Sequence, residues 1–256
     1  MTTLGVDIGT TGCKAAVFNP AGAMLSMAYR EYPLQHPEPG AAELDSPTVL
    51  DACEEVIRQA ASRAGEPVEA LGISSQGESF TPLDGEGRML HPALVSSDSR
   101  PRDQIAPFLD TFPAARLYQI TGQTPQPLFT LFKLLWFREK RGELFRKTRR
   151  FLCFEDLLQN RLGIEAHMGW PLAGRTMLFD LSTHRWNGEL LAAAGVDESQ
   201  LAVPVPSGTE CGMIPAARCR DLGLAKGCRV VAGGHDQTCG ALGSGVVEEG
   251  LAMYGN

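Results

Sequence analysis

The residues best suited to chemistry near the start of the chain form a short glycine- and threonine-rich segment. A terminal phosphate needs many converging hydrogen-bond donors, and glycine turns with flanking hydroxyls and a cation supply them. The donors here are Gly9, Thr10, Thr11 and Lys14. Asp7, which precedes them, is placed to hold Mg²⁺ directly or through water. The alternative is an ordinary glycine-rich hairpin turn, but an apolar strand on each side favours phosphate binding.

A second glycine-rich segment, residues 230–245, passes through two glycines into Asp236, where a helix is predicted to begin. A carboxylate at such a position can approach a ligand and accept the proton of a substrate hydroxyl. The alternative for Asp236 is a helix cap, which is the commoner use of an aspartate at a helix start. The neighbouring His235 is interpreted as structural or exposed rather than catalytic.

The elements around the first segment predict three antiparallel strands followed by a helix and a buried strand. Short turns separate the three strands, and strands joined by short turns pair antiparallel. The helix has Ser46 as its predicted N-cap, apolar residues at helical spacing and Gly65 as its stop. This order excludes a Rossmann start, which passes from the first strand directly into a helix. The predicted strands are 4–8, 13–18, 24–32 and, after the helix, 68–75.

The middle of the chain, residues 92–195, is predicted to be mostly helical with polar breaks. Its best helical stretches are 128–141 and 154–162, and residues 178–181 with Trp186 predict a short edge segment and a turn. A connector rich in Pro, Gly and Ser, a strand and a short helix are predicted after it. They span residues 204–213, 229–234 and 236–242.

The 256 residues are enough for one large domain or two modest ones, with a core that needs no disulfide or metal staples. The net charge of −7 argues against nucleic acid as a partner. No apolar run is long enough for a bilayer and no signal-peptide pattern begins the chain, so no membrane partner and a cytoplasmic location are expected. Seven scattered cysteines without a CxxC pair favour free thiols over a zinc site.

The two glycine-rich segments belong to a series of motifs that resembles the N-terminal half of the FGGY family of carbohydrate kinases. Each motif alone is modest evidence, but their order over nearly the whole chain is specific. The resemblance identifies residues 1–256 as the N-terminal domain of such a kinase, within the actin/hexokinase-like ATPase superfamily. The motifs are 6–11 with Lys14, 42–45, 73–78, 98–100, 121–122, 133–136, 175–180, 207–209, 222–224 and the segment around Asp236.

The resemblance implies an α/β fold, namely an actin-like (ribonuclease H-like) ATPase lobe with a mixed sheet, three antiparallel first strands and flanking helices. It implies an ATP-dependent kinase that transfers the γ-phosphate to a hydroxyl of a sugar or polyol, with Asp236 as the general base. ATP and Mg²⁺ are the implied cofactors, with Asp7 at the metal and Gly9, Thr10, Thr11 and Lys14 at the phosphates. The implied substrate-binding residues are Gln76, Gly77, Glu78, Asp98, Asp236 and Gln237.

The implied sugar pocket departs from two subfamilies of that family. Where glycerol kinases carry an Arg, a Trp and a Tyr, this chain has Gly77, Ser96 and Leu128. Xylulokinases have Met-His in the segment that here reads Gln76-Gly77-Glu78. The loss of large side chains predicts room for a larger or differently oriented substrate. The alternative is that Ser96 marks a non-standard or inactive member.

The family's second lobe carries a second phosphate loop and the adenine pocket, and this sequence has no counterpart of it. ATP is therefore expected to bind through that missing lobe, and this chain alone is expected to be inactive. A catalytically inactive sugar sensor or interaction module is the alternative function, against which the intact Asp7 and Asp236 argue. Another actin-like ATPase is disfavoured by segments 76–78 and 175–180. The identity of the sugar, the phosphorylated hydroxyl and a homodimer are left open.

Overall fold

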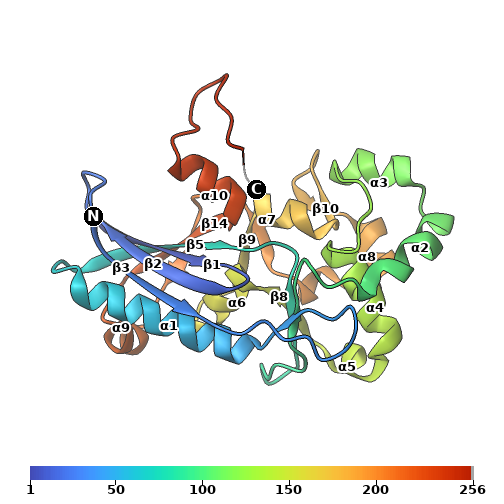
Figure 1. The fold of residues 1–256 in the computed structure, drawn as a ribbon, viewed down its shortest axis with the longest axis horizontal. Helices are drawn as coiled ribbons and strands as arrows, with labels where there is room; N and C mark the ends of the chain where they lie inside the picture. Colours follow the sequence, from blue (N-terminus) through green and yellow to red (C-terminus); the bar gives the residue numbers. More distant parts are fainter. Residues whose placement is uncertain (255–256) are drawn as a thin grey trace.

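A six-stranded mixed sheet forms one half of the molecule, and helices form most of the other half (Figure 1). The computed structural model describes residues 1–254. Strands β1, β5 and β14 are mutually parallel, whereas β2, β3 and β13 pair antiparallel with their neighbours. The antiparallel start and the mixed sheet confirm the predicted architecture. In spatial order the strands are β13 (Glu210–Met213), β14 (Arg229–His235), β5 (Val68–Ser75), β1 (Thr2–Ile8), β2 (Gly12–Phe18) and β3 (Met24–Glu31).

Helices cover both faces of this sheet, as Figure 1 shows. Helices α1 (Ser46–Arg63), α6 (Phe154–Arg161) and α9 (Ala216–Leu222) lie on one side, and α10 (Asp236–Gly243) lies on the other. Alternate residues of β1, namely Leu4, Val6 and Ile8, are at most 1% exposed and pack in the core against α1. Each such side chain contributes about 1.5–3 kcal/mol by leaving water. The pleat therefore directs Gly5 and Asp7 to the α10 side.

The predicted N-cap of α1 at Ser46 is wrong by one residue. Asp45 is the cap, and its Oδ2 accepts a hydrogen bond from the N–H of Thr48 at 3.1 Å. Ser46 is buried instead, with its hydroxyl 2.7 Å from that of Thr81. Both residue types cap helices well, so the sequence alone does not choose between them. The helix ends as predicted, because Gly65 follows it with a φ of +73°.

The helical half of the molecule is held together by aromatic side chains. Phe80 contacts Phe137 and Phe151 edge to face, with ring centroids 6.0 and 5.3 Å apart. The predicted stretches at 128–141 and 154–162 are confirmed by α4 and α6. Within residues 1–254 no helix is both long and apolar enough to cross a membrane. The helices of this half are η1 (Arg100–Gln104), α2 (Ile105–Thr111), α3 (Ala114–Thr121), α4 (Thr130–Lys140), α5 (Gly142–Lys147), α7 (Trp170–Ala173), η2 (Gly174–Thr176), α8 (Gly188–Ala194) and η3 (Glu198–Gln200).

Residues 204–213, predicted as a connector, contain strand residues, so this prediction is wrong in part. Val203–Val205 form β12, which pairs in parallel with β9, and β13 adds an edge strand to the main sheet. Proline and glycine mark turns, but proline is also tolerated in short edge strands. The remaining short strands pair as β4 (Glu43–Leu44) with β7 (Ala93–Leu94), β6 (Phe80–Leu83) with β8 (Arg150–Cys153), β10 (Phe179–Asp180) with β11 (Arg185–Trp186), and β12 with β9 (His167–Gly169).

Strand β14 carries a bulge at Gly233, just before it leads into α10. Its pairing with β5 shifts there, since Ala232 faces Ile73 and Gly234 faces Ser74. A Cβ on Gly233 would lie 2.0 Å from the carbonyl oxygen of Ile73. Glycine is therefore required, and the bulge sets the direction in which the chain enters α10.

Substitution of Gly233 by alanine should destabilise the chain by about 3 kcal/mol, because the new Cβ must displace the backbone of β5. Urea unfolding measures this loss. Gly72→Ala is the matched control in the neighbouring strand, since a Cβ on Gly72 would meet nothing within 4 Å. The control should stay within about 1 kcal/mol of the parent. Equal stability of the two variants would contradict the bulge geometry.

Candidate active site at the ends of three parallel strands

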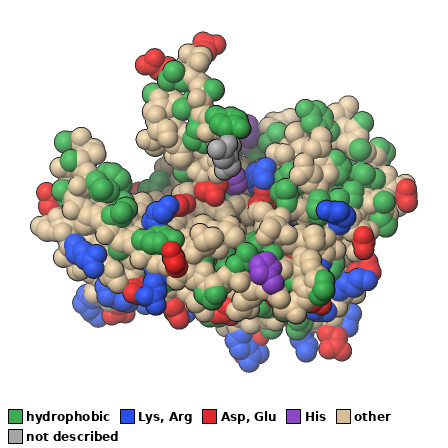
Figure 2. All heavy atoms as spheres, in the orientation of Figure 1, with side chains coloured by type: hydrophobic (Ala, Val, Ile, Leu, Met, Phe, Trp, Pro, Cys, Tyr) green, Lys and Arg blue, Asp and Glu red, His purple; other side chains and the backbone are tan. Residues whose placement is uncertain are grey.

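Strands β1, β5 and β14 end at the same edge of the sheet, where Asp7, Lys14 and Asp236 face one cavity; Gly9, Thr10, Thr11, Gln76, Gly77 and Glu78 lie outside its lining. Asp7, Lys14, Ser74, Asp236 and Gln237 line one cavity of about 500 Å³ between the sheet and α10. Figure 2 shows that the surface is hollowed on both sides of α10, with acidic and basic side chains at the bottom of the hollows. Open α/β sheets generally bind ligands outside the carboxyl ends of their parallel strands.

Asp7 faces this cavity and has two side-chain partners. The hydroxyl of Ser74 donates to its Oδ1 at 3.2 Å, and Nζ of Lys14 lies 3.9 Å from its Oδ2. Burial raises the pKa of Asp7 above its ordinary value, although Ser74 and Lys14 lower it. The carboxylate of Asp236 raises the pKa further, because two like charges share the cavity. A cation between the two carboxylates would relieve that repulsion.

The loop at residues 9–12 joins β1 to β2 and is fixed from two sides. The N–H of Gly9 donates to the carbonyl of Gly12 at 3.0 Å. The carbonyl of Gly9 accepts from the hydroxyl of Tyr32 at 2.6 Å and from Nε2 of Gln76 at 3.0 Å. The hydroxyl of Thr10 also donates to Oε1 of Gln76, at 3.4 Å. Gln76, predicted as a substrate ligand, therefore also holds the predicted phosphate loop in place.

Glu78 anchors a second polar cluster on the other side of Gln76. Its φ is +64°, a backbone conformation that is rare outside glycine, and its side chain is 1% exposed. Its Oε1 forms an ion pair with Arg175, and its Oε2 accepts from the hydroxyl of Ser96 at 3.0 Å. The ammonium of Lys133 donates to the carbonyl of Glu78 at 3.4 Å, and burial lowers the pKa of Lys133 to about 8. The cluster thus pairs the buried carboxylate of Glu78 with Arg175 and its backbone carbonyl with Lys133.

The absence of a side chain at Gly77 leaves room for the imidazole of His235. A Cβ at residue 77 would lie 2.8 Å from Cδ2 of His235 and 3.3 Å from Cβ of Arg175. Nδ1 of His235 is 3.4 Å from Oδ1 of Asp236. Burial lowers the pKa of His235, although the carboxylate of Asp236 raises it. The imidazole therefore connects the Gly77–Glu78 segment with Asp236, which is more than the structural or exposed role expected from the sequence.

Asp236 is the first residue of α10, and His235 rather than Asp236 is the N-cap. The helix-cap alternative for Asp236 is thus not what the structure shows. Its Oδ1 accepts from the N–H of Gln237 at 2.6 Å. The side chain stays 31% exposed, so its carboxylate is accessible from the cavity.

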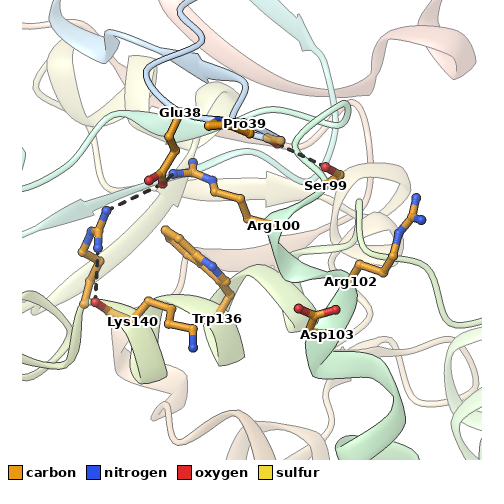
Figure 3. Close-up of a pocket in the computed structure, with 10 residues that line it drawn as sticks. Glu38, Pro39, Ser99, Arg100, Arg102, Asp103, Trp136 and Lys140 are labelled. Carbon is orange, nitrogen blue, oxygen red and sulfur yellow. Dashed lines mark hydrogen bonds and ion pairs between the residues drawn. The ribbon is translucent and has the colours of Figure 1, made fainter.

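Asp98, predicted as a substrate ligand, lies apart from this cavity and is fully buried. Its carboxylate accepts from the N–H of Ala42 at 2.9 Å and forms an ion pair of 2.6 Å with Arg100. Arg100 also stacks over Trp136, with 4.4 Å between its guanidinium carbon and the ring centroid. Figure 3 shows Arg100 and Trp136 beside a separate hollow of about 630 Å³, which none of the predicted site residues lines. The geometry favours a positioning role for Asp98 over contact with a ligand.

Comparison with known proteins decides which family this site belongs to. The sequence model of the FGGY family of carbohydrate kinases, N-terminal domain, matches residues 2–243. The chain belongs to the FGGY family of carbohydrate kinases. The predicted resemblance is therefore confirmed over nearly the whole chain.

Individual relatives of this FGGY kinase chain agree with the family match. The xylulose kinase of Escherichia coli (strain K12) is 29% identical over 251 residues, covering 98% of this chain and 51% of that protein. The glycerol kinase of Thermus brockianus is 33% identical over 265 residues, covering 98% of this chain and 52% of that protein. The crystal structure of xylulose kinase from Rhodospirillum rubrum matches with a TM-score of 0.92 at 24% identity, over 98% of this chain and 52% of that chain, which confirms the fold. The chain spans about half the length of the curated relatives it matches.

Three residues of this FGGY site were not predicted from the sequence as site residues, namely Arg175, Ser96 and His235. Arg175 stands in the matched motif 175–180, but only the structure pairs it with Glu78, which is 97 residues away. In the sequence, Ser96 stands out only as a position where related kinases carry a different residue. The sequence feature that points to His235 is Gly77, because the missing side chain leaves room for the imidazole. That link becomes visible only when the structure shows the two residues in contact.

The donors around the cavity fit Mg²⁺ and phosphate. Among residues 1–254 no group of three or more His, Cys, Asp or Glu side chains is arranged to hold a metal ion. Mg²⁺ does not need such a group, because it keeps several waters and binds through one or two carboxylates together with substrate phosphates. Asp7 and Asp236 place two carboxylates on this cavity, and the ammonium of Lys14 is a cation beside them.

Substitution of Asp236 by asparagine should lower the pKa of Asp7, because it removes the like charge that raises it. Carbon NMR of the side-chain carboxyls across a pH titration of residues 1–256 measures this. Asp221→Asn, which removes an exposed carboxylate on α9, is the control and should leave Asp7 unchanged. An unshifted pKa for Asp7 in the Asp236 variant would mean that the two carboxylates do not share a cavity.

Proposed function

We propose that this chain is the sugar-binding half of an ATP-dependent carbohydrate kinase that phosphorylates a hydroxyl of a sugar or polyol. The observation that carries the proposal is the convergence of Asp7, Lys14 and Asp236 on one cavity. Phosphoryl transfer needs positioned phosphates, a divalent cation and a base rather than covalent catalysis. Nothing in the site favours the alternative of an inactive sugar sensor, which needs no base.

Each part of the cavity has a role in this proposal. The carboxylate of Asp236 accepts the proton of the substrate hydroxyl as that oxygen forms its bond to the γ-phosphorus and ADP leaves. Lys14, the N–H groups of Thr10 and Thr11 and the hydroxyl of Thr11 bind phosphate oxygens. Gly9 shapes the loop, since its N–H already donates to Gly12, and the hydroxyl of Thr10 holds the loop to Gln76. Mg²⁺, held by Asp7 directly or through water, would neutralise charge on the phosphates when bound.

On the substrate side, Gln237 lies next to Asp236, lines the cavity and supplies an amide that can orient a vicinal polyol. Gln76 and Glu78 are buried and already hydrogen-bonded within the protein, so their proposed contribution is to order the walls of the sugar site. Gly77 supplies the space that His235 fills. Asp98 contributes indirectly, by holding Arg100 and the backbone at Ala42.

We propose that the complete enzyme joins this chain to a second half equivalent to the rest of its relatives. That half would supply the adenine pocket and a second phosphate loop, and its closure would exclude water from the cavity. Residues 1–256 alone are therefore proposed to bind sugar weakly and to show no sugar-dependent ATP consumption. A cytoplasmic location, a homodimer and the absence of nucleic-acid and membrane partners stay predictions.

In the complete enzyme, Asp236→Asn should reduce kcat by about 10²- to 10⁴-fold while leaving sugar binding largely intact. Asparagine keeps the shape of the side chain but accepts no proton at neutral pH. A coupled assay of ADP release measures turnover, and calorimetry measures sugar binding. Asp221→Asn is the control for a remote exposed carboxylate and should keep full activity. Turnover close to that of the parent would refute the base assignment.

Glycerol should be a poor substrate, although a glycerol kinase is among the relatives. A three-carbon polyol needs a tight pocket, and the positions for large clamping side chains hold Gly77, Ser96 and Leu128. Displacing the reacting oxygen by about 1 Å costs about 10²-fold in rate. A panel of pentuloses, hexuloses, polyols and glycerol, ranked by kcat/KM, tests this. Glycerol should rank about 10²-fold below the best substrate, and a first rank for glycerol would overturn the prediction.

A further inference from the structure

Side chains from two other segments hold both polar backbone groups of the bulge at Gly233. The N–H of Gly233 donates to Oε1 of Glu155 at 2.8 Å. The carbonyl of Gly233 accepts from the hydroxyl of Ser207 at 2.6 Å. A bulged residue is left out of the regular strand pairing, so these two side chains take the place of a neighbouring strand.

Glu155 joins three elements through one carboxylate. It lies in the first turn of α6, and its second oxygen, Oε2, accepts from the N–H of Gly169 at 2.9 Å at the end of β9. The side chain is fully buried. Each carboxylate oxygen thus accepts one backbone N–H, so the side chain at this position must offer two separate acceptor atoms.

A carboxylate in this position is costly to the fold. Burial raises the pKa of Glu155 to about 7. Among the described residues, only the N–H groups of Gly169 and Gly233 lower this pKa, and no cationic side chain does so. An apolar side chain of similar volume would avoid the cost of burying a charge, but it would leave both N–H groups without an acceptor. Glu155 holds Gly233, which lies three residues before Asp236, so the contact bears on the site.

The packing around the bulge leaves little freedom for the chain that follows it. A Cβ on Gly169 would lie 2.6 Å from the carbonyl oxygen of Gly233, so the two backbones are in close contact. A Cβ on Gly234 would lie 3.3 Å from Pro171. Asp236 follows two residues later, so a shift of the bulge is transmitted directly to its carboxylate.

We propose that Glu155 is a positioning residue, which holds the bulge at Gly233 so that the carboxylate of Asp236 points into the cavity. The proposal rests on the proposed role of Asp236 as the general base. Glu155 touches neither substrate nor phosphate; it acts through the N–H of Gly233, and Ser207 supports it from the carbonyl side.

In the complete enzyme, Glu155→Gln should lower kcat about 10- to 100-fold and change the KM for sugar by less than about 3-fold. The amide keeps the size of the side chain but offers one acceptor for two donors, so the N–H of Gly233 or that of Gly169 loses its acceptor and the bulge is held less firmly. Glu54→Gln is the matched control, because it removes a buried carboxylate on α1 that pairs with Arg161 and Arg218 and makes no bond to the bulge. The control should lose stability without losing kcat.

Ser207→Ala is the second variant, since Ser207 is exposed and its loss should not prevent folding. It should lower kcat several-fold with KM unchanged. Amide hydrogen exchange of residues 1–256 provides a readout independent of activity. In Glu155→Gln, the N–H of Gly233 or Gly169 should exchange at least about 10-fold faster than in the parent.

The outcomes separate this proposal from the proposed function. Unchanged exchange at both glycines, unchanged kcat in both variants, or an effect confined to KM would overturn the positioning role. Faster exchange with unchanged kcat, in an enzyme that Asp236→Asn inactivates, would also overturn it while leaving the base assignment standing. Activity in Asp236→Asn would instead remove the base assignment itself, whatever the exchange shows.

Discussion

Strand β5 pairs in parallel with β1 on one side and β14 on the other, and the rest of the site depends on this arrangement. The register sets Asp7 beside Ser74, and His235 beside Ser75. Three strand ends that are far apart in the sequence therefore meet at one edge, so that short segments after them suffice to build the site. The pleat then sends Asp7 to the α10 face and Ile8 to the core. A one-residue slip of β1 would exchange these two faces, and the core stabilises the register against it.

Charge is distributed unevenly between the two sides of Asp236. On the side of Asp7 and Lys14 the charged groups are half exposed, so their interactions are open to water and can be reorganised by an incoming phosphate. On the other side the buried Glu78 is paired with the partly exposed Arg175, and removal of Arg175 would leave a buried carboxylate without its ion-pair partner. Under the proposed function, the side of Asp7 and Lys14 is adaptable and the side of Glu78 preorganised, which suits a shared phosphate donor and a selected sugar.

Much of the fold could be predicted from the sequence because the local signals agree with the tertiary structure. The period-two pattern of β1, the turn glycines and the apolar stripe of α1 each point to the element that forms. The errors lie where two residue types serve one purpose, as with Asp45 and Ser46, or where proline and glycine occur in short edge strands. In the site, motifs indicated Asp7 and Asp236, whereas the contacts of Arg175 and His235 depend on long-range packing. Asp98 illustrates the opposite limit, since a motif indicates that a residue matters but not whether it touches the ligand.

The contact between Gly77 and His235 limits which substitutions each of the two positions can accept during evolution. Most side chains introduced at residue 77 would collide with the imidazole, and loss of the imidazole alone would open a gap beside Asp236. The two positions are therefore epistatic: the effect of a change at one depends on which residue occupies the other. Under the proposed function, a change of substrate preference is more accessible through a path that first shortens residue 235 and then enlarges residue 77. Directed-evolution libraries that randomise both codons together would reach sequences that single-site libraries discard.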